Sequence, residues 1–217
     1  MSWIESILWT VGCAALGYCA FIWGSAQYDQ AQGNRMVDRG QFDRAPSVDR
    51  PLDQRRPEVK LRPAAGSLVG RIRIPRLKLS AVIFEGTDDQ TLGRGVGHLA
   101  GTATPGESGN LVLAGHRDTF FRALKNIREG DEIEVTGPEG VSRYKVEFTQ
   151  IVAPEATEVL KATGGSTLTL ITCYPFRYIG NAPDRFVVRG QKVDKEAGSH
   201  ENVSVSGHKS GPARRRL

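Results

Sequence analysis

Residues 167–173 read TLTLITC, a stretch in which the side chains alternate as a β-strand requires. Leu168 and Leu170 share one face of such a strand, and Cys173 lies on the opposite face at its end. If the leucines pack into a hydrophobic core, the cysteine points away from it. The stretch therefore predicts an outward-pointing cysteine at the end of a core strand.

Two further segments place polar groups at strand ends. Residues 185–189 read RFVVR, so Arg185 starts a strand on the face opposite Phe186 and Val188. An apolar strand over residues 110–116 has His116 at its end. On β-scaffolds, loops that meet at strand ends line functional sites, so these groups are candidates for one site together with the cysteine.

The middle of the chain predicts an all-β domain over residues 67–193. Its apolar segments are short, rich in Val, Ile, Leu, Tyr and Phe, and separated by Gly, Pro and Asp turns. The predicted strands are residues 69–74, 81–85, 110–116, 132–136, 142–152, 167–173 and 185–193. Short helical turns are expected at residues 89–93 and 119–124. This many short strands in one domain is typical of a closed barrel or a sandwich.

The N-terminus predicts a membrane anchor over residues 1–26. Residues 6–26 hold no charged side chain and span about 30 Å as a helix, the hydrocarbon thickness of a bilayer. Trp3, Trp9 and Trp23 lie towards the two ends, where indole rings prefer the interface. A basic leader region and a cleavage site are missing, so we expect the anchor to stay uncleaved. A buried core helix is the alternative.

The flanks of the domain are polar. Residues 27–66 mix Asp, Arg, Gln and Pro without hydrophobic periodicity and predict a disordered linker, with a short helix between residues 27 and 42 as the alternative. Residues 194–217 contain three consecutive arginines near their end and predict a disordered basic tail, solvated or touching anionic polymers or lipids. The net charge of +5 is too mild to indicate nucleic acid.

Cysteine usage narrows the chemistry. Three cysteines exclude a disulfide-rich scaffold and a four-cysteine zinc site. Cys13 and Cys19 lie in the apolar N-terminal run, so Cys173 has no disulfide partner in the predicted domain. A lone cysteine with a histidine elsewhere is a candidate nucleophile and base, although a buried filler is the commoner role.

Three motifs in the domain resemble the signatures of the sortases, which are membrane-anchored cysteine transpeptidases. The motifs are LAGH at residues 113–116, TLITC at residues 169–173 and DRFVV at residues 184–188. The resemblance covers roughly residues 68–193, and the segments CYPF at 173–176 and AP at 182–183 are most similar to class D. It implies a closed eight-stranded β-barrel with short helices after an N-terminal transmembrane helix, outside the cytoplasmic membrane.

The resemblance also implies a reaction and its participants. A sortase cleaves an LPxTx-type sorting signal after Thr in a partner protein and transfers that protein to a cell-surface amine. Cys173 would be the nucleophile, Arg185 would stabilise the oxyanion, and His116 would exchange protons with the leaving and incoming amines. Thr172 and Arg177 are candidate substrate contacts, Thr172 with inward packing as an equal alternative. No cofactor and no metal are expected.

Several alternatives remain open at this level. His98 is a rival for the catalytic base, although its glycine-rich surroundings suggest a turn. Arg35, Arg39 and Arg44 weakly favour a cytoplasmic domain by the positive-inside rule, against the extracytoplasmic side implied by the chemistry. A membrane-tethered binding barrel without catalysis and a cysteine peptidase that only hydrolyses are the competing functions. Which proteins are substrates, which amine accepts them and the oligomeric state are not predicted.

Overall fold

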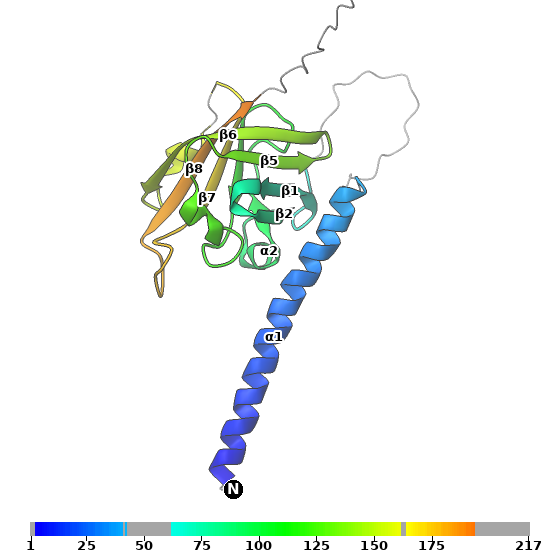
Figure 1. Ribbon diagram of the computed structural model, residues 1–217, viewed down its shortest axis with the longest axis vertical. Helices are drawn as coiled ribbons and strands as arrows, with labels where there is room; N and C mark the ends of the chain where they lie inside the picture. Colours follow the sequence, from blue (N-terminus) through cyan, green and yellow to red (C-terminus); the bar gives the residue numbers. More distant parts are fainter. Residues whose placement is uncertain (1–2, 41, 43–61, 162–163, 194–217) are drawn as a thin grey trace, which may run out of the picture.

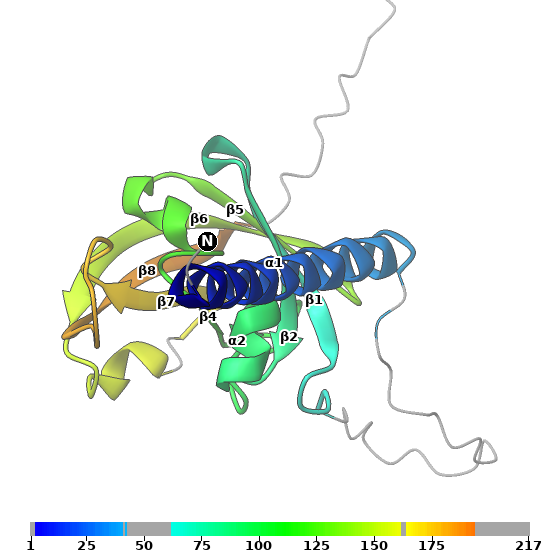
Figure 2. The same cartoon turned by 90° about the horizontal axis from the view of Figure 1, so that it is seen from below.

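The structure is a computed structural model that describes residues 3–40, 42, 62–161 and 164–193. In these residues a long N-terminal helix, α1 (Trp3–Asp38), lies against a closed barrel of eight strands (Figures 1 and 2). The strands are β1 (Leu68–Ile74), β2 (Leu79–Glu85), β3 (Val96–His98), β4 (Asn110–Ala114), β5 (Glu132–Gly137), β6 (Gly140–Val152), β7 (Thr167–Tyr174) and β8 (Asp184–Val193). The short helices are α2 (Asp89–Arg94), η1 (Pro75–Leu77), η2 (Arg122–Asn126) and η3 (Thr157–Leu160).

The barrel closes in the order β1-β2-β3-β4-β7-β8-β6-β5, with β5 pairing back onto β1. Two neighbouring pairs, β2–β3 and β4–β7, are parallel, and the other pairs are antiparallel. Among the described strands, closure gives each one a partner on both sides, which favours a stable all-β domain. The predicted closed barrel with short helices is therefore confirmed.

One strand was not predicted. Residues 96–98 read VGH in a glycine-rich stretch, which suggested a turn, but they form β3, pair with β2 and β4 and are buried. The close packing explains the glycine, because a Cβ on Gly97 would lie 2.3 Å from the carbonyl oxygen of Gly86. His98 is thus a residue of the barrel wall, and its expected place in a turn is wrong.

The barrel interior is filled by aliphatic and aromatic side chains from all parts of the domain. Leu168 and Leu170 of β7 and Val188 of β8 belong to this core, with Phe186 packed against it. The alternation predicted for β7 and β8 is confirmed, because the residues between these core positions face the outside of the barrel.

Helix α1 continues to Asp38, twelve residues beyond the predicted end of the anchor. Its last three turns dock on β1 and β2, where Val37 packs with Leu68, Val82 and Phe84. For residues 27–38 of the predicted linker, the structure favours the alternative of a helix over disorder, because contacts with the barrel stabilise helix in this polar segment. Residues 43–61 of that linker and the basic tail, residues 194–217, lie outside the described residues.

Candidate active site

The site is built on β7 and β8. Cys173 and Arg185 are direct partners in the antiparallel register of these strands. Cross-strand partners have Cβ atoms about 4.5–5.5 Å apart and point to the same face of the sheet. Both side chains are half-buried on the outer face of the barrel. The register therefore puts an arginine and a cysteine with a free thiol directly opposite each other, on the face that the strand alternation predicts.

His116 reaches the same level from the neighbouring strand. In the parallel pair β4–β7, Ala114 lies beside Ile171, and the amide of Gly115 donates to the carbonyl of Ile171 at 3.1 Å. His116 is two residues beyond Ala114, as Cys173 is two residues beyond Ile171. Although β4 ends at Ala114, the same register continued for two residues would bring His116 to the level of Cys173, next to the β7–β8 pair.

Thr172 stabilises this arrangement from inside. Its side chain is 2% exposed, and its hydroxyl donates to the carbonyl oxygen of Gly115 at 2.7 Å. That contact ties β7 to the residue that precedes His116. The geometry thus favours the inward-packing alternative for Thr172, as a positioning residue.

Arg117 fixes the loop between β7 and β8. Its guanidinium donates to the carbonyls of Pro175 at 3.1 Å, Tyr178 at 2.9 Å and Gly180 at 3.3 Å. It also lies over the ring of Tyr178, 5.7 Å from the centroid. One arginine next to His116 therefore holds the loop that connects Cys173 to Arg185. Arg177 lies exposed in that loop.

Sequence reasoning did not find this role of Arg117. The only signal in the sequence was its position directly after the candidate histidine, and charge at a strand end does not reveal three carbonyl acceptors some sixty residues away. The base of the same loop is anchored by aromatic stacking. Phe176 lies edge-on to Phe186 at 5.2 Å between centroids, and Tyr174 contacts both rings.

At the end of β7 away from Cys173, the η3 segment covers the outer face of the barrel. Asn110 donates to the carbonyls of Val159, Leu160 and Lys161, and its own side-chain oxygen accepts from Thr167 and Thr169. This buried cluster holds the η3 segment against β4 and β7.

Arg189 completes that cluster from β8. It donates to the carbonyl of Val159 at 2.9 Å, and burial lowers the pKa of its guanidinium from the ordinary value, an effect that Glu147 opposes. The η3 segment covers the outer face of β7 and β8 up to a few residues before Cys173. The outer face of these strands is therefore buried at one end and accessible at the end with Cys173.

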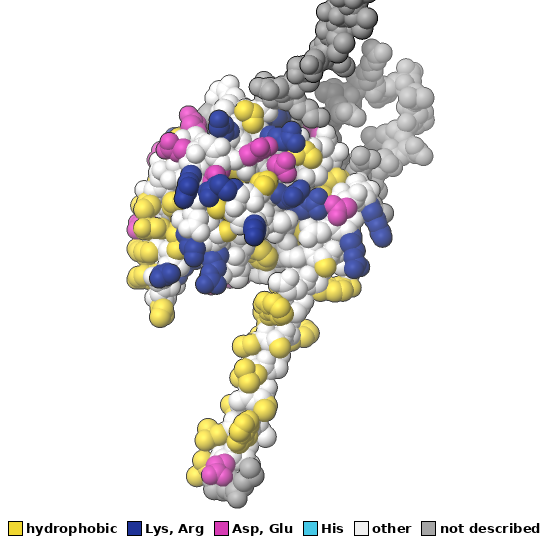
Figure 3. All heavy atoms as spheres, viewed as in Figure 1, with side chains coloured by type: hydrophobic (Ala, Val, Ile, Leu, Met, Phe, Trp, Pro, Cys, Tyr) yellow, Lys and Arg dark blue, Asp and Glu magenta, His cyan; other side chains and the backbone are white. Residues whose placement is uncertain are grey.

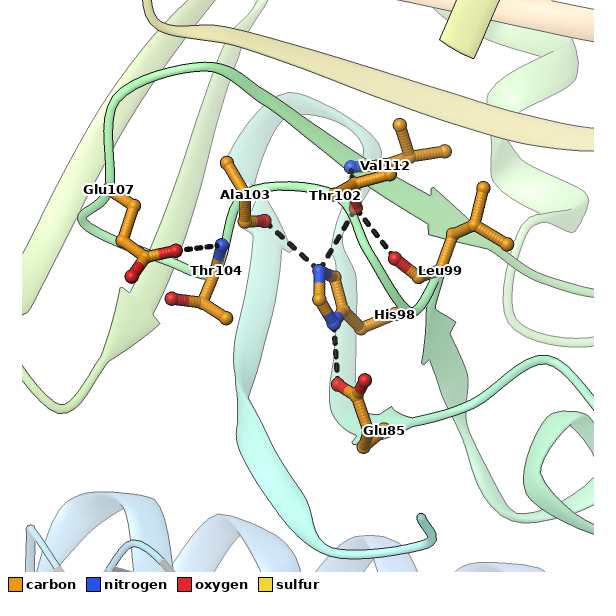
Figure 4. Close-up of polar contacts among 8 residues, drawn as sticks. All are labelled: Glu85, His98, Leu99, Thr102, Ala103, Thr104, Glu107 and Val112. Atoms are coloured by element: carbon orange, nitrogen blue, oxygen red, sulfur yellow. Dashed lines mark hydrogen bonds and ion pairs between the residues drawn. The ribbon is translucent and has the colours of Figure 1, made fainter. Parts of the chain in front are cut away.

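His98 lies apart from these groups in a buried polar cluster (Figure 4). Its Nδ1 is 2.5 Å from a carboxylate oxygen of Glu85, and its Nε2 is 3.0 Å from the carbonyl oxygen of Ala103. The side chain is 1% exposed. Nε2 also lies 3.1 Å from the hydroxyl oxygen of Thr102, so both ring nitrogens have polar partners inside the protein. A histidine used in this way has no nitrogen left for a substrate, which leaves His116 as the candidate base.

Metal ligation has no visible basis in the described part of the chain. Among residues 3–40, 42, 62–161 and 164–193, no three His, Cys, Asp or Glu side chains gather as a metal site requires. The chemistry that the site can support is that of a thiol, an imidazole and a guanidinium.

Comparison with known proteins agrees with this fold. The family model of the sortase domain matches residues 72–193. Sortase D of Bacillus subtilis (strain 168) is 37% identical over 142 residues, which cover 65% of this chain and 72% of that protein.

Solved structures show the same architecture. The Sortase D5 transpeptidase of Clostridium perfringens has a TM-score of 0.60 at 23% identity, with 79% of this chain and 99% of that chain covered, which shows the fold. Sortase C1 of Streptococcus agalactiae has a TM-score of 0.54 at 30% identity, with 59% and 69% covered.

The barrel and these matches define a β-barrel enzyme of the cysteine transpeptidase class. The chain belongs to the sortase family, whose members act on proteins that carry sorting signals. The resemblance found in the sequence motifs is thereby confirmed. Helix α1 contains an uncharged segment long and apolar enough to cross a membrane, which fits a single-pass anchor.

Proposed function

We propose that Cys173, His116 and Arg185 catalyse transpeptidation of an LPxTx-type signal through a thioacyl intermediate. The observation that supports this most directly is the cross-strand pairing of Cys173 with Arg185, together with the pairing of β7 to β4, the strand that leads to His116. A cysteine that only fills space in the structure would need neither an arginine opposite it on the next strand nor a histidine nearby.

In the first half of the reaction, the Cys173 thiolate attacks the carbonyl carbon of the signal's threonine. The oxygen of the tetrahedral intermediate carries a negative charge, which the fixed guanidinium of Arg185 stabilises without reorganisation. The bond from that carbon to the next residue's nitrogen breaks, and His116 as imidazolium donates a proton to the leaving amine. The product is a thioester on Cys173.

In the second half, a cell-surface amine replaces the departed peptide. Neutral His116 accepts a proton from the incoming amine as its nitrogen attacks the thioester. The carbon–sulfur bond breaks, the thiolate returns, and an amide links the two partners. Histidine suits both steps because its ordinary pKa of about 6.5 allows either protonation state near neutral pH.

The backbone of Arg185 and its surroundings hold the guanidinium in place. Its Nη1 donates to the carbonyls of Asp184 at 3.0 Å and Ala182 at 3.3 Å. These contacts hold one side of the guanidinium against the backbone at the end of the β7–β8 loop. We assign Arg177, exposed in this loop, to the substrate rim.

We place the barrel on the extracytoplasmic side, because cell-surface amines are the expected acceptors. The uncharged segment of α1 would span the membrane, with Trp3, Trp9 and Trp23 exposed along it.

The test is product analysis with the full chain in detergent. The enzyme is incubated with LPxTA and LPxTG peptides, with and without a glycine-based amine, and products are identified by mass spectrometry. Cleavage after threonine with amide formation supports the proposal, and the Cys173→Ala variant should form neither product. Hydrolysis that an added amine never diverts would identify a peptidase, and a folded but inert protein would identify a binding barrel.

A further inference from the structure

The structure constrains how the barrel stands on the membrane. The uncharged run of α1 ends at Ala26, and Asp29 already pairs with Arg94 of the barrel domain at 3.0 Å. Three residues of helix rise by about 4.5 Å, less than one turn. The barrel therefore begins almost where the hydrophobic segment ends, without a spacer between them.

The docking of α1 is specific. Gln30 accepts from the amide of Val82 at 2.8 Å and donates to the carbonyl of Arg94. Gly33 lies so close to the barrel that a Cβ there would be 2.7 Å from a methyl group of Val82. Further along, Asp38 pairs with Arg71 at 2.7 Å. Contacts along three turns of one helix face hold the barrel in one orientation relative to the anchor.

In that orientation the β7–β8 loop extends from the barrel in the same direction as the N-terminal part of α1, to one side of the helix (Figure 1). Tyr178 and Ile179 lie in this loop, and Ile179 is fully exposed at 101%. Residues 174–183 contain Arg177 and no acidic residue. Figure 3 shows hydrophobic and basic side chains together on this end of the barrel.

We propose that the β7–β8 loop is a membrane-contact element, with Tyr178 and Ile179 in the headgroup region of an anionic bilayer. An aromatic residue and an exposed aliphatic residue beside arginine are the side chains that an interface of this kind accommodates. Arg117 fixes the loop backbone through three carbonyls, so the contact would also set the height of Cys173 above the lipid. This inference rests on the anchoring of α1 and is independent of the transfer reaction.

Depth-dependent quenching in the full chain tests the proposal. A variant with Cys13→Ser, Cys19→Ser, Cys173→Ala and Ile179→Cys is labelled with a fluorophore and reconstituted into phosphatidylcholine–phosphatidylglycerol vesicles containing spin-labelled lipid. The matched control carries Val141→Cys, which is exposed in the β5–β6 hairpin at another part of the barrel. We expect at least twofold stronger quenching at position 179. Equal, weak quenching at both positions would overturn the proposal.

A second variant tests the role of docking. Gly33→Leu adds a side chain on the face of α1 that docks against Val82. This contact lies outside the barrel core, so the barrel should still fold. We expect quenching at position 179 to fall to the level of position 141. Undiminished quenching, with circular dichroism showing an intact barrel, would contradict the claim that α1 docking directs the loop to the membrane.

Discussion

Cys173 and Arg185 face each other across the antiparallel register of β7 and β8. This relationship links the proposed nucleophile to the proposed oxyanion group through the backbone ladder between β7 and β8, so both residues have their Cα atoms in strands. The parallel pairing of β4 with β7 ends at Ala114, two residues before His116, and its register leads the chain towards the level of Cys173. Positions defined by a closed barrel are rigid, which favours preorganised catalysis.

Removing the guanidinium of Arg185 should destabilise the transition state more than it weakens substrate binding. We expect Arg185→Ala to lower kcat by about 100-fold or more, because one oxyanion donor is commonly worth that much, with a smaller change in KM. Steady-state kinetics on an LPxTA peptide measure both. Arg177→Ala is the matched control, expected to alter mainly KM, and an Arg185→Ala enzyme with nearly normal kcat would exclude an oxyanion role.

Arg117 should control the order of the β7–β8 loop. Arg117→Ala removes hydrogen bonds to Pro175, Tyr178 and Gly180, so we expect faster hydrogen exchange over residues 175–181 and about a tenfold fall in kcat/KM. Arg122→Ala, a change at an exposed position on η2, is the control. If exchange in the loop is the same in both variants, Arg117 does not order it.

The hydroxyl of Thr172 should contribute more to stability and activity than the β-branched shape of the side chain. Thr172→Val leaves the carbonyl of Gly115 without its donor, and we expect a loss of about 1–3 kcal/mol in the free energy of unfolding and a several-fold lower kcat. Thr172→Ser keeps the donor and should recover most of the activity. Urea unfolding and peptide kinetics measure these effects, and a serine variant as impaired as the valine one would argue against the hydrogen bond.

The buried pair of His98 and Glu85 should stabilise the barrel wall without taking part in catalysis. Glu85→Gln replaces the carboxylate that contacts the buried imidazole with a neutral amide, and leaving a buried polar group without its partner costs about 1–3 kcal/mol. Thermal unfolding in detergent should show the loss, while kcat of the folded enzyme stays within about twofold of the wild type. A large, selective loss of kcat would instead make His98 a candidate for the catalytic base.

Asp131 should make the domain sensitive to acid. The Arg76 guanidinium holds the pKa of this carboxyl below its ordinary value, and the amide of Arg128 also donates to it. A lowered pKa in the folded state means that this stabilisation is complete above about pH 4 and is lost as the pH falls through the folded pKa. Asp131→Asn should therefore be less stable at pH 7 and should lose less stability than the wild type on acidification. Parallel urea titrations at pH 7 and pH 3 would show it, and identical acid sensitivity would contradict the assignment.

Periodicity and short motifs predicted most of the barrel. Alternation placed Leu168 and Leu170 in the core and Cys173 outside it, because strand parity is fixed by local geometry. Alternation could not reveal β3, whose three residues are too few for a periodic signal. Hydropathy ended the anchor at residue 26, because it reports the membrane segment and not the docking of Gln30 and Gly33 on the barrel.

Sequence patterns indicated the candidate reactive groups of the site but not the residues that position them. The motifs indicated His116, Cys173 and Arg185, but the contacts that position them join residues far apart in the chain. Arg117 and Thr172 make such contacts, with acceptors that are 57 to 63 residues away. Their roles depend on strand register and loop path, which single-sequence patterns do not define.

A thioester on Cys173 is the intermediate on which the proposed reaction depends, and intact-protein mass spectrometry can detect it. The full chain is mixed with an LPxTA peptide without added amine, quenched in acid, and digested to locate any adduct. We predict a mass increase equal to the peptide fragment ending in threonine, located on Cys173 and removed as an amide when a glycine-based amine is added. Peptide turnover that continues without any adduct, and that persists in Cys173→Ala, would contradict this mechanism.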